Sequence, residues 1–188
     1  MKENPKTKGF TLIETLVAIS VLLTAVVAPL TIAARSISYT NFARDQIIAS
    51  YLAFDALETI IAMRDYNVAN KDAWDSRISC FSGTCRIDTS YEDIDDINVE
   101  NCVENDSNPN FDPATTCYLS VYSNGFYGYG DNRRDLGSRT PTPFKRIIDI
   151  ENIPGTSDEK LVVSRVKFKT GILTREFTFK LNLFNTGV

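Results

Sequence analysis

An uncharged run, TLVAISVLLTAVVAPLTIAA, covers residues 15–34 and decides the fold of this chain. Glu14 and Arg35 are the charged residues that flank it. Each residue adds about 1.5 Å to a helix, so a helix over this run is about 30 Å long, which matches the hydrocarbon core of a bilayer. We therefore expect residues 15–34 to form a membrane-spanning helix.

The composition of the chain excludes several classes of function. The chain has 188 residues, of which 43% are hydrophobic, a net charge of -4 and no histidine. Without histidine there is no Ser-His-Asp or Cys-His catalytic pair and no histidine-ligated zinc. The acidic balance argues against a nucleic-acid surface, which needs clustered Lys and Arg. We expect no enzyme, no cofactor and no nucleic-acid partner.

The segment before the run, residues 1–9, reads MKENPKTKG and contains three Lys and one Glu. A basic segment of this kind stays on the cytoplasmic side of a membrane, so the residues after Arg35 are expected to face outward. A secretory signal peptide has a shorter apolar region followed by a small-residue cleavage site, which this sequence lacks. Glu14 is unusual, because an ionised group near hydrocarbon is costly and usually marks function.

The sequence around Glu14 resembles a known processing signal. Residues 8–18 read KGFTLIETLVA, which is similar to the class III signal of type IV pilins and type II secretion pseudopilins. The resemblance is specific over residues 6–34 and is one of architecture elsewhere. It implies that a prepilin peptidase cuts between Gly9 and Phe10 and methylates Phe10. It also implies that Glu14 acts in filament assembly.

The chemistry of these residues agrees with that role. Glycine before the cut allows the backbone to approach a protease closely. Cleavage leaves a positive amine on Phe10 in an apolar region, and an ion pair with the Glu14 of a neighbouring subunit would offset the burial of both charges. Alternatively, Glu14 only complements the helix dipole, worth roughly 0.3 to 1 kcal/mol. That alternative does not explain the Gly-Phe junction.

Apolar residues continue at three- and four-residue spacings after Arg35, and no proline follows until well beyond residue 64. This pattern predicts one helix over residues 10–65, with its first half in the membrane and its second half packed on a head domain. Pro29 removes one helical hydrogen bond and is expected to bend the helix.

The head, residues 66–188, begins with a loop-rich region, residues 66–143, that contains all four cysteines. These are Cys80, Cys85, Cys102 and Cys117. Outside the cytoplasm four cysteines suggest two disulfides, with three possible pairings. We favour Cys80 with Cys85, in a hairpin where Ile78 and Ile87 are paired strand residues, and Cys102 with Cys117. A zinc site is the alternative, although no CxxC pair is present.

Acidic side chains in the same region resemble the start of a calcium loop. The oxygen-bearing residues are Asp106, Asn108, Asn110 and Asp112. The match to an EF-hand then fails, because Phe111 stands where glycine is needed and Cys117 where a bidentate Glu is needed. We favour a solvated acidic loop and keep calcium as a weak candidate.

Aromatic residues cluster near arginines in the next stretch. The aromatic residues are Tyr118, Tyr122, Phe126, Tyr127 and Tyr129, and the arginines are Arg133, Arg134 and Arg139. Such residues can build a stacking platform for a glycan or a single-stranded nucleic acid. They also serve in strand packing, which we favour because the chain is acidic.

The last part of the chain, residues 144–188, has the pattern of an antiparallel meander. Strands are predicted at residues 144–153, 161–168 and 172–184, rich in β-branched and aromatic residues and separated by turn sequences. The final strand alternates, so one of its faces is expected to cover the long helix. The predicted class is α+β, a long N-terminal helix packed on a C-terminal antiparallel sheet, which is a pilin-like architecture.

These observations together predict a structural subunit, a minor pilin or pseudopilin, of a type IV pilus-like or type II secretion-like filament. Residues 1–9 would be a cleaved cytoplasmic leader with a charge of +2, which leaves -6 on the mature chain. The expected partners are other pilin-like subunits, the prepilin peptidase, the filament assembly machinery and the cytoplasmic membrane. The chain would cross that inner membrane once, with its N-terminus inside, before joining a surface or periplasmic filament. The alternative is a single-pass anchored extracytoplasmic ligand-binding module.

Overall fold

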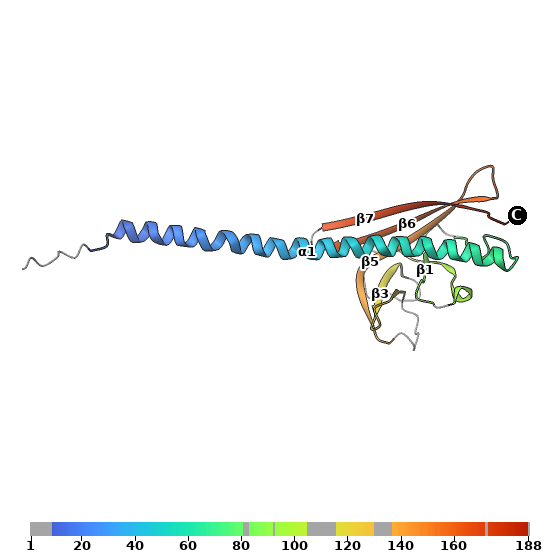
Figure 1. The fold of residues 1–188 in the computed structure, drawn as a ribbon, viewed down its shortest axis with the longest axis horizontal. Helices are drawn as coiled ribbons and strands as arrows, with labels where there is room; N and C mark the ends of the chain where they lie inside the picture. Colours follow the sequence, from blue (N-terminus) through green and yellow to red (C-terminus); the bar gives the residue numbers. More distant parts are fainter. Residues whose placement is uncertain are drawn as a thin grey trace, which may run out of the picture. The chain divides into compact units, whose positions relative to one another are not determined.

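The computed structural model of the chain describes residues 9–80, 83–91, 93–104, 116–129, 137–171 and 173–187. One long helix, α1 (Leu12–Ala69), is followed by an antiparallel β-sheet (Figure 1). The chain divides into two units, Met1–Ala43 and Arg44–Val188, and α1 contributes residues to both. The predicted α+β class, with a long N-terminal helix and a C-terminal antiparallel sheet, is confirmed.

Helix α1 extends four residues beyond its predicted end at residue 65. Asn67, which reads as a helix-exit residue in the sequence, lies inside the helix and is fully buried. Its side-chain amide donates to the backbone carbonyls of Trp74 and Ser76 at 3.2 and 2.8 Å. Lys71 follows the helix in the left-handed region, with φ of 63°. The last helical turn therefore holds the segment after it in place, which the sequence pattern does not show.

The last three strands form the predicted meander. They are β5 (Arg139–Asn152), β6 (Glu159–Thr170) and β7 (Leu173–Phe184). β5 pairs with β6, and β6 pairs with β7, both antiparallel. Their β-branched and aromatic residues, and the turn sequences between them, place the three strands from the sequence.

The region of residues 66–143 contains more regular structure than predicted. Its elements are β1 (Cys85–Ile87), the 3-10 helix η1 (Ile94–Asp96), β2 (Val99–Asn101), β3 (Tyr118–Tyr122) and β4 (Tyr127–Gly128). The sheet order is β2-β1-β5-β3-β4, with β6 and β7 added on the other side of β5. β5 begins five residues earlier than predicted, because its first part pairs with β3. Pro141 and Pro143 lie in this part and obscure the strand pattern, since proline is tolerated only at edges and irregular pairings.

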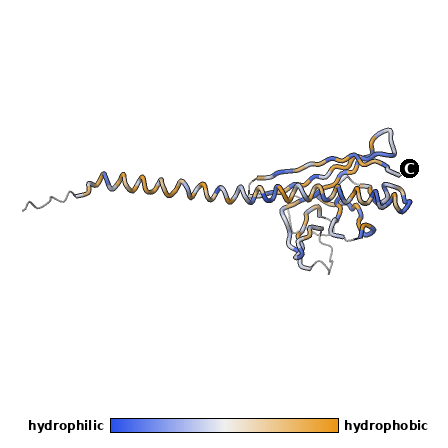
Figure 2. The backbone as a smooth tube through the Cα atoms, in the orientation of Figure 1, coloured by the Kyte–Doolittle hydropathy of each residue, from blue (hydrophilic) through white to orange (hydrophobic). Residues whose placement is uncertain are grey.

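The main hydrophobic core of the second unit lies between α1 and the sheet. Its buried residues are Ala56, Leu57, Ile60, Met63, Trp74, Ile78, Ile87, Ile97, Ile148, Val162 and Leu183. The final strand turns one face to the helix as predicted, because the ring centroids of Phe179 and Phe54 are 4.2 Å apart and Leu183 is buried. Hydrophobic and hydrophilic residues alternate along the strands in Figure 2.

Two disulfides join the cysteines in the pairs favoured from the sequence, Cys80–Cys85 and Cys102–Cys117. The predicted hairpin with Ile78 opposite Ile87 is wrong. β1, which contains Ile87, pairs with β2 and β5, and Ile78 lies outside the strands. Both isoleucines are buried in the main core instead. Their apolar character therefore reflects packing against α1 and not cross-strand pairing.

Candidate functional site

The N-terminal end of α1 holds the residues on which the processing hypothesis depends. Gly9 and Phe10 precede the helix, and Glu14 lies in its first turn. The backbone N–H of Glu14 donates to the Thr11 hydroxyl at 3.4 Å, in the Thr-x-x-Glu spacing of a capping box. The Glu14 carboxylate forms no ion pair with any residue that the structure describes. Its charge therefore has no partner among those residues.

The fold does not require glycine at position 9. A Cβ atom built on Gly9 would meet no atom within 4 Å, and Gly9 is not in the left-handed region of φ. Phe10, the next residue, is exposed. Neither packing within the described chain nor backbone conformation explains this glycine. Close approach of another protein to the backbone would explain it.

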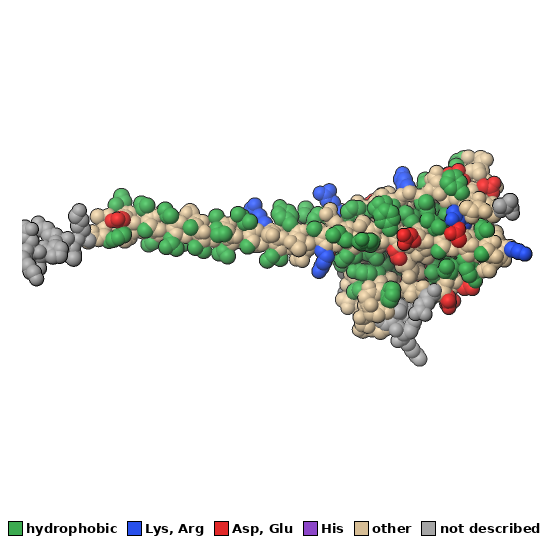
Figure 3. All heavy atoms as spheres, viewed as in Figure 1, with side chains coloured by type: hydrophobic (Ala, Val, Ile, Leu, Met, Phe, Trp, Pro, Cys, Tyr) green, Lys and Arg blue, Asp and Glu red, His purple; other side chains and the backbone are tan. Residues whose placement is uncertain are grey.

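The first part of α1 is an exposed apolar helix. All residues from 9 to 41 are exposed, and hydrophobic side chains cover the visible face of this segment (Figure 3). The helix is long and apolar enough to cross a membrane, by length and composition. Exposed apolar surface of this extent marks a membrane or protein contact. The methylation motif described below agrees with membrane anchoring of this segment.

The hydroxyl groups of the uncharged run are satisfied within the helix. Its four Ser and Thr side chains, those of Thr15, Ser20, Thr24 and Thr31, each donate to a backbone carbonyl three residues earlier, at 2.8 to 2.9 Å. Pro29 lies inside the helix and leaves the carbonyl of Ala25 without its usual N–H donor. A helix that satisfies its own hydroxyls is compatible with a hydrocarbon environment.

Comparison with known families identifies the same segment. The chain carries the prokaryotic N-terminal methylation motif, matched over residues 4–28. This motif is the class III signal of type IV pilins and pseudopilins. No curated protein and no solved structure matches the chain. The methylation motif points to a pilin-like structural subunit rather than an enzyme, and pilin-like proteins associate with one another in membrane-assembled filaments.

The weak calcium candidates Asp106, Asn108, Asn110 and Asp112 lie outside the residues that the structure describes. Among the described residues, no group of three or more Asp, Glu, Cys or His side chains could hold a metal ion. The zinc alternative is wrong for the cysteines, because all four form disulfides.

The aromatic cluster is largely part of the packing. Tyr122 and Tyr129 are buried, and the rings of Tyr127 and Phe144 meet edge to face with centroids 6.1 Å apart. Phe126, by contrast, is exposed. Arg133 and Arg134 lie outside the described residues, and Arg139 begins β5. The described rings therefore serve mainly to join β3 and β4 to the rest of the sheet.

A buried guanidinium, that of Arg146 on β5, joins α1 to the sheet. Its side chain is fully buried, and one Nη donates to the carbonyl of Leu52 at 3.0 Å and to Asp55 Oδ2 at 3.1 Å. The other Nη donates to the carbonyl of Ile87 at 2.6 Å, and Nε donates to the Tyr129 hydroxyl at 3.2 Å. We did not predict this cluster from the sequence. The available signal was one charged residue at a helix-facing position of an apolar strand.

The protonation states in this cluster follow from burial and charge. Burial raises the pKa of Tyr129, and the opposing effect of Arg146 is smaller. Burial also acts to lower the pKa of Arg146, but Tyr129 and Asp55 outweigh it, so this pKa is raised. The Tyr129 hydroxyl therefore stays protonated and donates to the Arg146 carbonyl at 3.2 Å. The cluster contains one charge pair, Arg146 with Asp55, and a neutral tyrosine.

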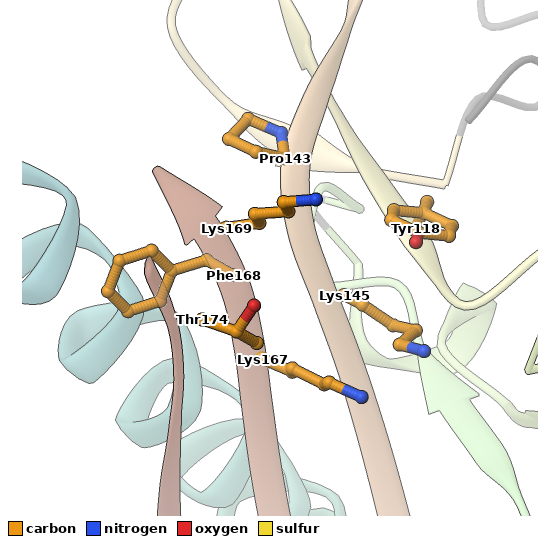
Figure 4. A pocket seen from close by; sticks show the side chains of 7 residues that line it. All are labelled: Tyr118, Pro143, Lys145, Lys167, Phe168, Lys169 and Thr174. Carbon is orange, nitrogen blue, oxygen red and sulfur yellow. The ribbon is translucent and has the colours of Figure 1, made fainter. Parts of the chain in front are cut away.

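A pocket of about 290 Å³ on the sheet contains three lysines (Figure 4). Lys145 and Lys167 are register partners on β5 and β6, so they lie on the same face, and Lys169 follows on β6. The buried Lys145 ammonium already pairs with Glu104 at 2.9 Å and lies 5.6 Å from the Tyr118 ring. The chain itself therefore supplies the counter-charge of Lys145.

Proposed function

We propose that this chain is a structural subunit, a minor pilin or pseudopilin, of a type IV pilus-like or type II secretion-like filament. The observation that carries the proposal is the N-terminal methylation motif, which leads directly into a helix whose apolar residues are exposed from 9 to 41. Burial of this surface, first in the cytoplasmic membrane and then among neighbouring helices, accounts for its composition.

Processing would occur on the cytoplasmic side, between Gly9 and Phe10. A prepilin peptidase would remove residues 1–9 as a leader and methylate the new N-terminus on Phe10. The finding that Gly9 is dispensable for the fold supports this role. The second unit would lie on the far side of the membrane, where its two disulfides would form and persist.

Glu14 would pair with the Phe10 amine of a neighbouring subunit during assembly by the filament machinery. The Glu14 carboxylate has no ion-pair partner among the described residues, which supports a partner in another subunit. In a low-dielectric environment, an unpaired carboxylate would be strongly unfavourable.

The N-terminus of the membrane-extracted protein tests the processing step. After expression with a prepilin peptidase, the mass of the protein should be that of a chain beginning at a methylated Phe10. After expression without the peptidase, the chain should still begin at Met1. A cut anywhere else in the presence of the peptidase, or no cut, would contradict the proposal. That result would favour the anchored binding module.

The second prediction concerns Glu14. We expect Glu14→Ala to insert into the membrane normally and to be incorporated into filaments at least tenfold less, because the Phe10 amine of the neighbour loses its counter-charge. Immunoblots of sheared filaments and of the membrane fraction measure the two pools. Thr11→Ala is the matched control, because it removes the helix cap and keeps the carboxylate. Normal incorporation of Glu14→Ala would show that the carboxylate has no assembly role.

A further inference from the structure

A hydrophobic groove of about 600 Å³ lies on the second unit, between α1 and the turn that joins β3 to β4. Three exposed aromatic side chains line it: Tyr51, Phe54 and Phe126 are 71%, 47% and 59% exposed. Hydrophobic side chains gather on the visible face of this unit in Figure 3. Exposed aromatic residues that converge on one groove are typical of a protein contact.

The groove also has an acidic side. Asp55 and Glu58 on α1 both line it. The Asp55 carboxylate already accepts hydrogen bonds from Arg146 and Thr89. Glu58 is exposed and forms no ion pair within the part of the chain that the structure describes. The groove therefore offers an apolar floor and one carboxylate without a cationic partner.

One face of α1 in the first unit has the complementary chemistry. Ile32, Arg35 and Tyr39 follow one another at three- and four-residue spacing and share this face. Ile32 and Tyr39 are 68% and 66% exposed. Arg35 is also exposed and makes no ion pair with any described residue. This face therefore presents apolar side chains around one unpaired cation.

We propose that the groove receives this helix face from a second copy of the chain, with Arg35 of one copy paired with Glu58 of the other. The proposal rests on the proposed function as a filament subunit. Copies inserted side by side in one membrane have Arg35 at the same depth, so Arg35 of one lies level with Arg35 of the next. Contact with Glu58 needs copies that are staggered by about 35 Å, as in a filament, whereas the pair of Glu14 with the Phe10 amine needs a stagger of only about 6 Å. The copy that offers Arg35 to the groove is therefore a more distant one than the copy that pairs with Glu14. The contact therefore belongs to the assembled state.

Cysteine crosslinking tests the contact. The four native cysteines are all in disulfides, so thiols introduced by Arg35→Cys and Glu58→Cys are the free ones. Under mild oxidation, we expect covalent multimers from filaments of the double variant and monomers from its membrane pool. The single variants are controls for pairing of identical positions. Ile37→Cys with Glu58→Cys is the matched control, because Ile37 is exposed on another face of the helix and should not crosslink.

The outcomes separate this contact from the proposed function. If the unmodified chain is cut before Phe10 and assembles, but the double cysteine variant assembles without crosslinks, the groove contact is wrong and the filament function stands. If the unmodified chain is neither cut nor assembled, the filament function itself fails. A crosslinked partner of another sequence would overturn the assignment to a second copy.

Charge exchange tests the ion pair itself. Arg35→Glu and Glu58→Arg should each reduce the assembled fraction several-fold, and the double exchange should restore it. Failure of the double exchange to exceed either single variant would overturn the pairing of Arg35 with Glu58.

Discussion

At the scale of single residues, Arg146 has the largest number of distinct partners described above. Burying a guanidinium is unfavourable unless its donors are used, and here they reach two backbone carbonyls, a carboxylate and a hydroxyl. These partners come from α1, from β1 and from Tyr129, which directly follows β4. Arg146 therefore fixes the position of three elements at once.

Replacement of Arg146 by methionine is expected to lower the free energy of unfolding by about 3 kcal/mol, because two buried carbonyls and Asp55 lose their donor. Urea titration of the full chain in detergent, followed by fluorescence of the single tryptophan, Trp74, measures the loss. Arg165→Met is the matched control. Its ion pair with Asp149 is partly exposed, so the expected loss is below about 1 kcal/mol. Equal losses in the two variants would show that the buried contacts of Arg146 contribute no more to the free energy of unfolding than a partly exposed ion pair does.

Tyr129 gives the head a sensitivity to high pH. Its pKa is raised by burial in the folded chain, so the unfolded chain loses this proton first as the pH rises. The stabilisation is complete below about pH 10, the ordinary tyrosine value, and is lost as the pH rises through the folded pKa. We expect the urea midpoint to fall above about pH 10, and to fall less in Tyr129→Phe. Tyr51→Phe is the control, because Tyr51 is 71% exposed, whereas burial raises the pKa of Tyr127 as well. An unchanged pH profile in Tyr129→Phe would contradict this assignment.

At the scale of elements, the sequence predicts the long helices and strands, whose residue patterns extend over many positions. The uncharged run and its continuation predict α1. Segments rich in β-branched and aromatic residues predict the meander of β5, β6 and β7, and β7 also alternates. The short strands β2 and β3 are not predicted, and β1 is predicted only at Ile87 and with the wrong partner, because three to five residues are too few for a period to be recognised. The pairing of β1 and β3 depends on long-range contacts with β5, which no local pattern contains.

Some of the candidate functional residues can be predicted from the sequence and others cannot. The segment with the methylation motif is predictable, because its residues are contiguous in the sequence. The Arg146 cluster and the aromatic groove are not, since each is assembled from segments far apart in the chain. Asp55, for example, reads in the sequence only as a polar position on an amphipathic helix. It becomes significant because folding places Arg146 and Thr89 beside it.

The two disulfides are expected to contribute unequally. Cys102–Cys117 spans 15 residues and Cys80–Cys85 spans 5. The chain-entropy relation predicts that replacing Cys102 and Cys117 by alanine lowers the free energy of unfolding by about 3 kcal/mol. For Cys80 and Cys85 it predicts a loss of about 2 kcal/mol. Unfolding of the two double variants under non-reducing conditions measures both. A larger loss from Cys80–Cys85 would mean that packing, and not loop closure, sets their contributions.

At the scale of the whole molecule, the chain combines two units that differ in how their apolar residues are exposed. The first, Met1–Ala43, has exposed apolar side chains over residues 9–41, whereas the second, Arg44–Val188, has its own buried core. The composition of the whole chain hides this difference, because the net charge of -4 combines a basic stretch over residues 1–9, an uncharged run over residues 15–34 and an acidic remainder.

The second unit is expected to fold without the first. A chain that begins at Arg44 should be monomeric without detergent and should lose Trp74 fluorescence and far-UV circular dichroism in one cooperative transition. A chain that begins at residue 70 is the control. It lacks Leu57, Ile60 and Met63 from the core, so it should not unfold cooperatively. Aggregation of the fragment that begins at Arg44 would show that its core is insufficient.

On the proposed topology, the disulfides would also set an order of maturation. Cys102 and Cys117 pack against Ile147 in a small buried cluster, so this part of the second unit would be complete only after oxidation. Cytosolic thiols stay reduced. On the proposed topology, a newly made subunit would therefore wait in the membrane with its anchor finished and its head unfinished. Oxidation outside the cytoplasm would then determine when a subunit becomes fit for assembly.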